Sequence, residues 1–146
     1  MHCSHAHLAT LAAVLLVLAL GAACASSERA DPAYPADPLH GEWTVESIEG
    51  APVVDRSPAF LGFEADGRVY GNSSVNRVSG TWSFADGELA LSQLVSTRMA
   101  GPPALMDQEQ RLLAALGRVG GFEVDDEGRL DLVTREGTAL VSATRR

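Results

Sequence analysis

Lysine is absent from this chain, and only two of its 146 residues are cysteines. The eleven cationic side chains are therefore all arginines, and 19 acidic residues outnumber them, which gives a formal charge of −8. Such an acidic balance disfavours partners that carry negative charge, namely nucleic acid and anionic membrane surfaces. The sequence therefore predicts no nucleic-acid partner.

Histidine is almost as scarce, because His40 is the only one after residue 7. Nucleophilic catalysis needs a nucleophile, a base and an orienting group, and no serine lies in a Gly-x-Ser-x-Gly turn. The densest acidic group, 125–127, lacks the spacing of a calcium loop and resembles a solvated hairpin turn. We expect no catalytic residues, no metal and no cofactor. A carboxylate pair on the strands stays an open alternative, although strand alternation points most of these side chains outward.

The N-terminal segment has the pattern of a signal peptide spanning residues 1–23. Residues 11–20 are continuously apolar, and the small residues Gly21 to Ala23 precede Cys24. An apolar region of about ten residues before a small-residue cleavage site is typical of secretory leaders. We expect cleavage between Ala23 and Cys24. The apolar stretch from Leu8 to Ala25 nearly reaches the roughly 20 residues of a spanning helix, so a retained anchor is the alternative.

Residues 20–24 resemble the lipobox of bacterial lipoproteins. The resemblance implies that the thiol of Cys24 receives a diacylglycerol and becomes the new N-terminus. Gly21 stands where leucine is usual, and residues 1–7 contain no Lys or Arg, so ordinary cleavage remains the alternative. Each buried methylene contributes about 0.8 kcal/mol, so the acyl chains would anchor the protein stably in a membrane. Because Ala25 is not aspartate, the resemblance favours the outer membrane, facing the periplasm, in a bacterium with two membranes.

A tether and one domain follow the leader. Residues 24–38 are rich in Ala, Ser, Asp and Pro, which predicts an extended tether. Residues 39–144 read as one domain of short strands separated by turns that pair an acidic residue with glycine. We expect hairpins at 65–67 and 86–87 and at the turns 125–128 and 135–137. The predicted fold is α+β and mostly β, a curled antiparallel sheet or small partial barrel with one helix packed against it.

The predicted helix begins at Pro102 and Pro103, where a missing N–H costs nothing, and ends at Gly117. Its apolar positions recur at helical spacing. They are Leu105, Met106, Leu112, Leu113 and Leu116. We place Asp107, Gln108, Gln110 and Arg111 on the opposite, solvent-facing side.

Three segments carry a resemblance to the META domain family of HslJ-like bacterial lipoproteins, and it covers residues 39–143. The first is residues 39–43, the second is residues 71–82, and the third is residues 96–101 followed by Glu109. The motif residues, which we expect to be structural, are Gly41, Trp43, Gly71, Asn72, Asn76, Gly80, Trp82, Thr97, Arg98 and Met99.

Many family members carry cysteine where this chain has Val75 and Gly101. This chain lacks both of these cysteines, which fits the loss of one bridge or one paired contact. Their absence also removes any redox role based on them. The resemblance implies a compact β-rich fold with one helix, an envelope location and no established catalytic activity. Some members are associated with stress and antibiotic tolerance.

Two motif segments allow a structural and a functional interpretation. The polar segment from Gly71 to Gly80 is either a hydrogen-bonded bend that closes the sheet, which we favour, or a recognition surface. Arg98 either locks its loop to an internal acid, which we favour, or binds a carboxylate of a partner.

The sequence therefore predicts a lipid-anchored envelope protein with a non-enzymatic binding or structural role and an unidentified envelope protein partner. The alternative function is a carrier of a small apolar ligand within the curled sheet. That alternative requires a cavity of roughly 300 Å³ or more lined by apolar residues.

Overall fold

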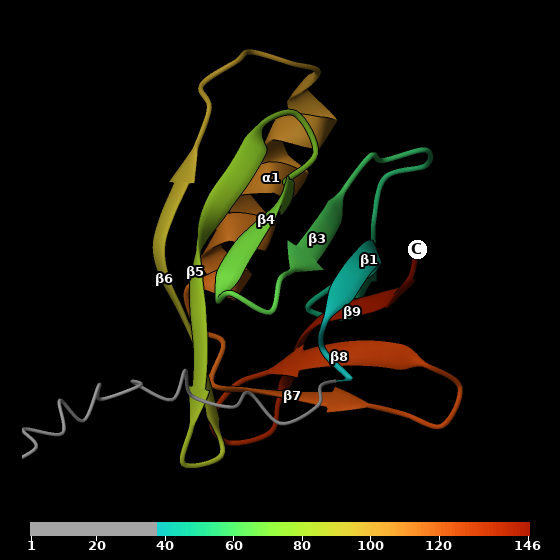
Figure 1. Cartoon of the computed structure of the whole chain (residues 1–146). Coiled ribbons are helices and arrows are strands. Elements are labelled where there is room, and N and C mark those ends of the chain that lie inside the picture. The colour runs from blue at the N-terminus through green and yellow to red at the C-terminus, as the bar shows by residue number, and fades with distance from the viewer. Residues whose placement is uncertain (1–37) are drawn as a thin grey trace, which may run out of the picture. The chain divides into compact units, whose positions relative to one another are not determined.

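The computed structural model describes residues 38–146, which form nine strands and one helix (Figure 1). The predicted leader, Cys24 and the tether lie outside these residues, except for Pro38. The strands are β1 Gly41–Ile48, β2 Ala51–Pro52, β3 Phe60–Phe63, β4 Arg68–Asn72, β5 Arg77–Ala85, β6 Glu88–Ser96, β7 Gly121–Val124, β8 Arg129–Val133 and β9 Ala139–Arg145. The helix is α1, Pro103–Leu116.

The strands form one antiparallel sheet in the order β6-β5-β4-β3-β1-β9-β8-β7, and β2 pairs with β1. The two ends of this order approach each other, because the N–H of Leu89 on β6 donates to the carbonyl of Gly120 just before β7, at 3.0 Å. The sheet is therefore curled into a half-barrel. The predicted fold class, a curled antiparallel sheet with a single helix, is confirmed.

The turns lie where the acidic–glycine pairs predicted them. Gly67 and Gly87 have φ angles of 84° and 82°, a region that glycine enters without steric cost. These two turns join β3 to β4 and β5 to β6, and the turns at 125–128 and 135–137 join β7, β8 and β9. Turn chemistry therefore sets which consecutive strands become neighbours, whereas the pairing of β1 with β9 joins strands far apart in the sequence.

The helix begins after Pro102 and ends before Gly117, as predicted. Gly117 has a φ of −68°, so it ends the helix without the left-handed conformation for which glycine is usually required. The buried positions are Gln108, Glu109, Leu112, Ala115 and Leu116. The prediction that Gln108 faces solvent is wrong, because its exposed fraction is 0%. The buried stripe begins with two polar side chains instead of apolar ones.

The concave side of the sheet holds the core, against which α1 packs through contacts with β1 and β9. Trp43, Phe63 and Trp82 are buried there. Phe84 and Phe122 are only partly buried, and they meet edge to face at 5.4 Å between ring centroids. Among residues 38–146, no helix has the length and hydrophobicity needed to cross a membrane.

Candidate functional site

Asn76 lies in the turn between β4 and β5, and its side chain joins the second motif segment to the third. Its Oδ1 accepts hydrogen bonds from the hydroxyl of Thr97 and from the N–H of Met99, both at 2.7 Å. Its Nδ2 donates to Glu109 Oε1 at 2.8 Å. Because both ends of the amide are used, the side chain holds the loop after β6 and the helix against one turn.

Glu109 completes this arrangement from the first half of α1. Its Oε2 accepts the backbone N–H groups of Val75 and Asn76 at 3.1 and 2.7 Å. Burial alone would raise the pKa of the Glu109 carboxyl. The hydrogen bonds from the Asn76 side chain and from the two backbone N–H groups outweigh burial and hold that pKa below its usual value. Glu109 is therefore an ionised, buried and fully engaged acceptor.

Gln108, the neighbour of Glu109, ties α1 to a second pair of loops. Its Oε1 accepts the N–H of Val54 at 2.5 Å, and its Nε2 donates to the hydroxyls of Ser57 and Ser74 at 2.6 and 2.8 Å. One buried amide thereby joins the loop before β3, the turn before β5 and the helix. Satisfied polar groups of this kind specify one packing arrangement, because each lost partner leaves a buried donor or acceptor unpaired.

The turn at the centre of the segment from Gly71 to Gly80 is therefore a hydrogen-bonded bend, which is the interpretation that we favoured, while residues on both sides of this turn line a surface hollow. Ser73, Ser74 and Asn76 are buried, and Asn72 Oδ1 accepts the N–H of Ser74 at 2.8 Å. A Cβ on Gly71 would lie 2.1 Å from the carbonyl oxygen of Phe60, so only glycine fits there.

The loop after β6 is fastened by Thr97 and not by Arg98. Thr97 donates its hydroxyl to Asn76 and its N–H to the carbonyl of Arg77, the latter at 3.1 Å. Arg98 is exposed and has no ion pair with any acidic side chain of residues 38–146. The internal partner that we favoured for Arg98 is therefore not found in the part of the chain that the structure describes.

The remaining motif residues also have packing roles. Trp43 is buried, donates its Nε1–H to the carbonyl of Leu39 at 2.8 Å, and carries the Arg145 guanidinium 4.4 Å above its ring. Gly41 has a φ of 119° and faces the same arginine. Gly80 lies at the bulge between β5 and β6, where a Cβ would lie 2.7 Å from the carbonyl oxygen of Ser92.

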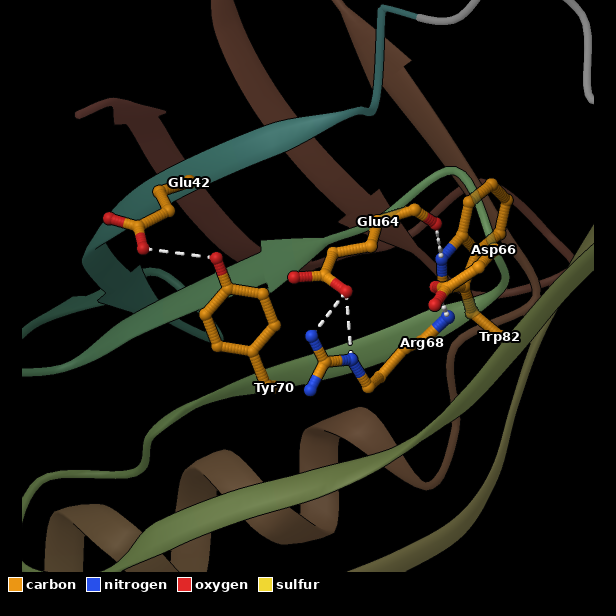
Figure 2. A network of polar contacts seen from close by, with 6 residues as sticks. All are labelled: Glu42, Glu64, Asp66, Arg68, Tyr70 and Trp82. Carbon is orange, nitrogen blue, oxygen red and sulfur yellow. Dashed lines mark hydrogen bonds and ion pairs between the residues drawn. The ribbon is translucent and has the colours of Figure 1, made fainter.

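A polar network covers the solvent-facing side of β1, β3 and β4 (Figure 2). Tyr70 lies across Gly62, whose absent Cβ would be 2.4 Å from the tyrosine ring, and donates its hydroxyl to Glu42 at 3.0 Å. This bond to a carboxylate raises the pKa of Tyr70 above its ordinary value, and partial burial adds to the shift. Arg68 donates two hydrogen bonds to Glu64, at 2.7 and 2.5 Å.

Trp82 closes the same network from the core side, because its Nε1–H donates to the carbonyl of Glu64 at 2.9 Å. Figure 2 shows this bond beside the Glu64–Arg68 pair. The buried indole is thereby linked to Glu64 and Arg68, and the Arg68 guanidinium lies 5.6 Å from the centroid of the Tyr70 ring, whose hydroxyl reaches Glu42.

A hollow of about 560 Å³ opens beside this network on the outer side of β3 to β6. Its lining includes Phe60, Tyr70, Arg77, Ser79 and Val95. Phe60 and Tyr70 meet edge to face, with ring centroids 6.2 Å apart. Most of the lining surface is apolar, and Arg77 is its only charged residue.

A second, shallower hollow of about 340 Å³ adjoins the first at Ser96 and Thr97. Its lining includes Arg98 and Met99. Val95 and Met99 are 63% and 56% exposed, and they are the large hydrophobic side chains that residues 38–146 expose. Both therefore lie on one continuous surface, which we call the β6 surface and define as the linings of the two hollows.

Sequence reasoning missed the part of Val95 in this surface and the roles of Gln108 and Glu109, although the less favoured interpretations of Gly71 to Gly80 and of Arg98 pointed to residues that line it. Glu109 stands three residues before Leu112 and seven before Leu116, so helical spacing is the signal that could have placed it on the buried face. Ala23 and Cys24 lie outside the described residues. No group of three or more potential metal ligands gathers among residues 38–146.

Three solved structures resemble this fold. One protein, solved by NMR, is 26% identical with a TM-score of 0.56, and the match covers 73% of this chain and 93% of that one. Another NMR structure, from Burkholderia xenovorans, is 24% identical with a TM-score of 0.58 and coverages of 75% and 90%. A crystal structure of a DUF4847 family protein from Bacteroides vulgatus is 15% identical, with a TM-score of 0.53 and coverages of 74% and 94%.

The last two similarities show the fold alone. No curated protein matches the chain significantly. A family model, that of the META domain, matches residues 37–146, which include every strand, the helix and the network around Asn76. This chain therefore belongs to the META domain family.

Proposed function

We propose that this protein is a lipid-anchored envelope protein whose META domain binds a partner protein through the β6 surface, without catalysis. Membership of the META domain family suggests an envelope-associated protein. The observation that carries the binding role is the coincidence of Val95 and Met99 with two adjoining hollows. Large exposed apolar side chains that gather on one concave surface are typical of interaction sites.

The position of the β6 surface is compatible with an anchor at Cys24. In the β1–β3–β4 ladder, Gly41 pairs with Phe63 at one end, whereas Phe60 pairs with Asn72 at the other. The larger hollow lies at the Phe60 end, so it is at the opposite end of the ladder from the point where the chain enters β1. A domain held by its N-terminal side would leave this surface accessible.

The carrier alternative finds less support. It needs an apolar cavity inside the curled sheet, and the concave side of the sheet is occupied by core side chains such as Trp43, Phe63 and Leu112, each at most 2% exposed. The 560 Å³ hollow opens on the outer side of the sheet instead.

The binding role is tested by chemical crosslinking in cells with Val95→Asp in the full-length protein. Ala90→Asp is the matched control, because Ala90 is also exposed on β6 but lies outside both hollows. We expect Val95→Asp to remove a specific crosslinked envelope protein that the wild type and Ala90→Asp retain. A crosslink pattern that is the same for all three proteins would refute the binding surface.

The anchor is tested separately with Cys24→Ser. We expect this variant to leave the membrane fraction while its domain stays folded. A variant that remains membrane-bound with its leader attached would show that residues 8–25 are a spanning helix and that the lipid anchor is wrong.

A further inference from the structure

Most arginines in this domain are engaged by other groups of residues 38–146. Six of them form ion pairs with acidic side chains of residues 38–146, namely Arg68, Arg111, Arg118, Arg129, Arg135 and Arg146. Arg145 stacks on Trp43 and donates to two backbone carbonyls. Arg56, Arg77 and Arg98 have no acidic partner within the described residues, and two of these three line the β6 surface.

The charge on the β6 surface is therefore opposite in sign to that of the chain as a whole. Arg77 is the only charged residue of the larger hollow, and Arg98 shares the smaller one with Glu109. Glu109 is 5% exposed, and its two carboxylate oxygens already accept hydrogen bonds from Val75 and Asn76. The surface thus presents two unpaired guanidinium groups around an apolar lining.

The backbone beside the hollows is also suited to a peptide. Among residues 38–146, β6 is the last strand of the sheet order and has β5 as its only ladder partner. Its contact with the β7 side is made near Leu89, at the other end of the strand. A bulge separates the two halves of β6, so Leu94–Ser96 forms a short edge of its own next to the larger hollow. Free strand edges bind extended segments by main-chain hydrogen bonds, and neighbouring pockets select side chains.

From these observations we infer that the β6 surface recognises an extended, acidic peptide segment of a partner protein, with one large apolar side chain in the 560 Å³ hollow and carboxylates on Arg77 and Arg98. A guanidinium binds a carboxylate through two parallel N–H donors, which selects acidic over neutral segments. The Phe60–Tyr70 pair offers aromatic faces and edges to the apolar side chain. This inference rests on the proposed function and specifies the chemistry of the partner.

The first experiment uses backbone amide chemical shifts of the domain, residues 38–146, after its fold has been verified by circular dichroism. The probe is the synthetic peptide Asp-Asp-Trp-Asp-Asp, and the controls replace its Asp residues with Lys or its Trp with Ala. We expect the acidic Trp peptide to shift amides of residues 77–79 and 94–99, and both controls to bind at least about tenfold more weakly. Added salt should weaken the binding, because exposed charges are screened.

Charge-reversed variants make the test specific. Arg77→Glu and Arg98→Glu should each weaken binding of the acidic peptide about tenfold, whereas Arg56→Glu should leave it unchanged. Arg56 is the matched control, because it is also exposed and lacks an acidic partner within residues 38–146 but lies in neither hollow. The inference would be overturned if the Lys peptide caused the same amide shifts, or if Arg56→Glu weakened peptide binding as much as Arg77→Glu or Arg98→Glu. It would also be overturned if the acidic peptide caused no amide shift at millimolar concentration.

Two further outcomes separate this inference from the proposed function. If Val95→Asp removes the crosslinked partner while Arg77→Glu and Arg98→Glu do not, the surface binds a partner but not through charge, and only the inference fails. If the domain binds vesicles containing phosphatidylglycerol through these arginines and does not bind the acidic peptide, the occupant is a lipid surface and the inference is wrong.

Discussion

Replacement of Glu109 is the perturbation for which the structure gives the clearest expected magnitude. Three donors converge on its carboxylate, namely the N–H groups of Val75 and Asn76 and the Nδ2 of Asn76. A buried donor left without a partner costs about 1–3 kcal/mol. Glu109→Ala removes the acceptor of all three, so we expect it to lower the free energy of unfolding by about 3–6 kcal/mol. That is a large part of the roughly 5–15 kcal/mol typical of a domain.

Glu109→Gln separates the charge from the shape of the side chain. A glutamine has one acceptor oxygen, so its NH2 group must face either the two backbone N–H groups or the Nδ2 of Asn76. Asn76 cannot turn over to help, because its Oδ1 already accepts from Thr97 and Met99. We expect a loss of about 2–3 kcal/mol, between wild type and Glu109→Ala.

The effect of Glu109→Gln should depend on pH in one direction. The folded-state pKa of Glu109 lies below its ordinary value of 4.5, so the ionised side chain contributes its full stabilisation above about pH 4.5. That contribution is lost as the pH falls below 4.5 and through the folded-state pKa. The stability gap between wild type and Glu109→Gln should therefore be widest near neutral pH and should narrow under acid.

Urea unfolding followed by the fluorescence of the buried Trp43 and Trp82 measures this gap at each pH. The control is Glu123→Gln, because Glu123 is exposed on β7 and should change stability by less than about 0.5 kcal/mol. Equal unfolding midpoints for Glu109→Gln and wild type at neutral pH, or a gap that does not narrow under acid, would refute the reasoning.

Three other predictions follow from close contacts in the structure. A Cβ on Gly101 would lie 3.4 Å from the Cβ of Val75, so the double variant Val75→Cys/Gly101→Cys should form a disulfide. Thiol titration would detect this bond, which should stabilise the domain by about 3 kcal/mol. Gly101→Cys alone should destabilise it, since the new Cβ would meet both Val75 methyl groups. Glu42→Gln should lower the raised pKa of Tyr70, because the charged acceptor of the tyrosine hydroxyl is lost. The absorbance of the phenolate measures this pKa, and an unchanged titration would exclude the hydrogen bond between Tyr70 and Glu42. Gly62→Ala should cost about 1–3 kcal/mol by displacing the Tyr70 ring, and a Tyr70→Ala background should abolish that cost.

The proximity of Val75 and Gly101 also explains a departure seen in the sequence. Relatives with cysteine at these two positions would bring the two side chains together. In this chain a branched valine fills the space that a side chain at position 101 would otherwise occupy. The paired absence of the cysteines therefore corresponds to one contact in the fold.

The turns, the helix and the fold class were predictable because they depend on local signals. Asp66-Gly67 and Asp86-Gly87 specify tight turns, and Pro102 specifies a helix start, whatever surrounds them. Burial of Gln108 was not predictable, because glutamine on a helix usually faces solvent. Its partners at Val54, Ser57 and Ser74 are 34 to 54 residues away in the chain.

The candidate site was predictable only in part, because its contacts also join residues far apart in the sequence. Motif segments indicated that Asn76 and Thr97 matter, but not that one amide joins them. The exposure of Val95 was not predictable, because the bulge that changes which side chains of β6 face outward forms only when β6 pairs with β5. Arg98 was given an internal partner on the strength of its charge, although only the folded chain reveals which acids lie within reach.

The pairing of β1 with β9 has a consequence for how the chain acquires its structure during synthesis. The first and last long strands are neighbours in the middle of the sheet, with Trp43 opposite Arg145. A nascent chain can assemble β1 with β3 to β6, and later β7 with β8, but these two pieces have no ladder between them until residues 139–145 emerge. Completion of the sheet therefore waits for β9, and a chain shortened before residue 139 would expose two unmatched sheet edges to its neighbours.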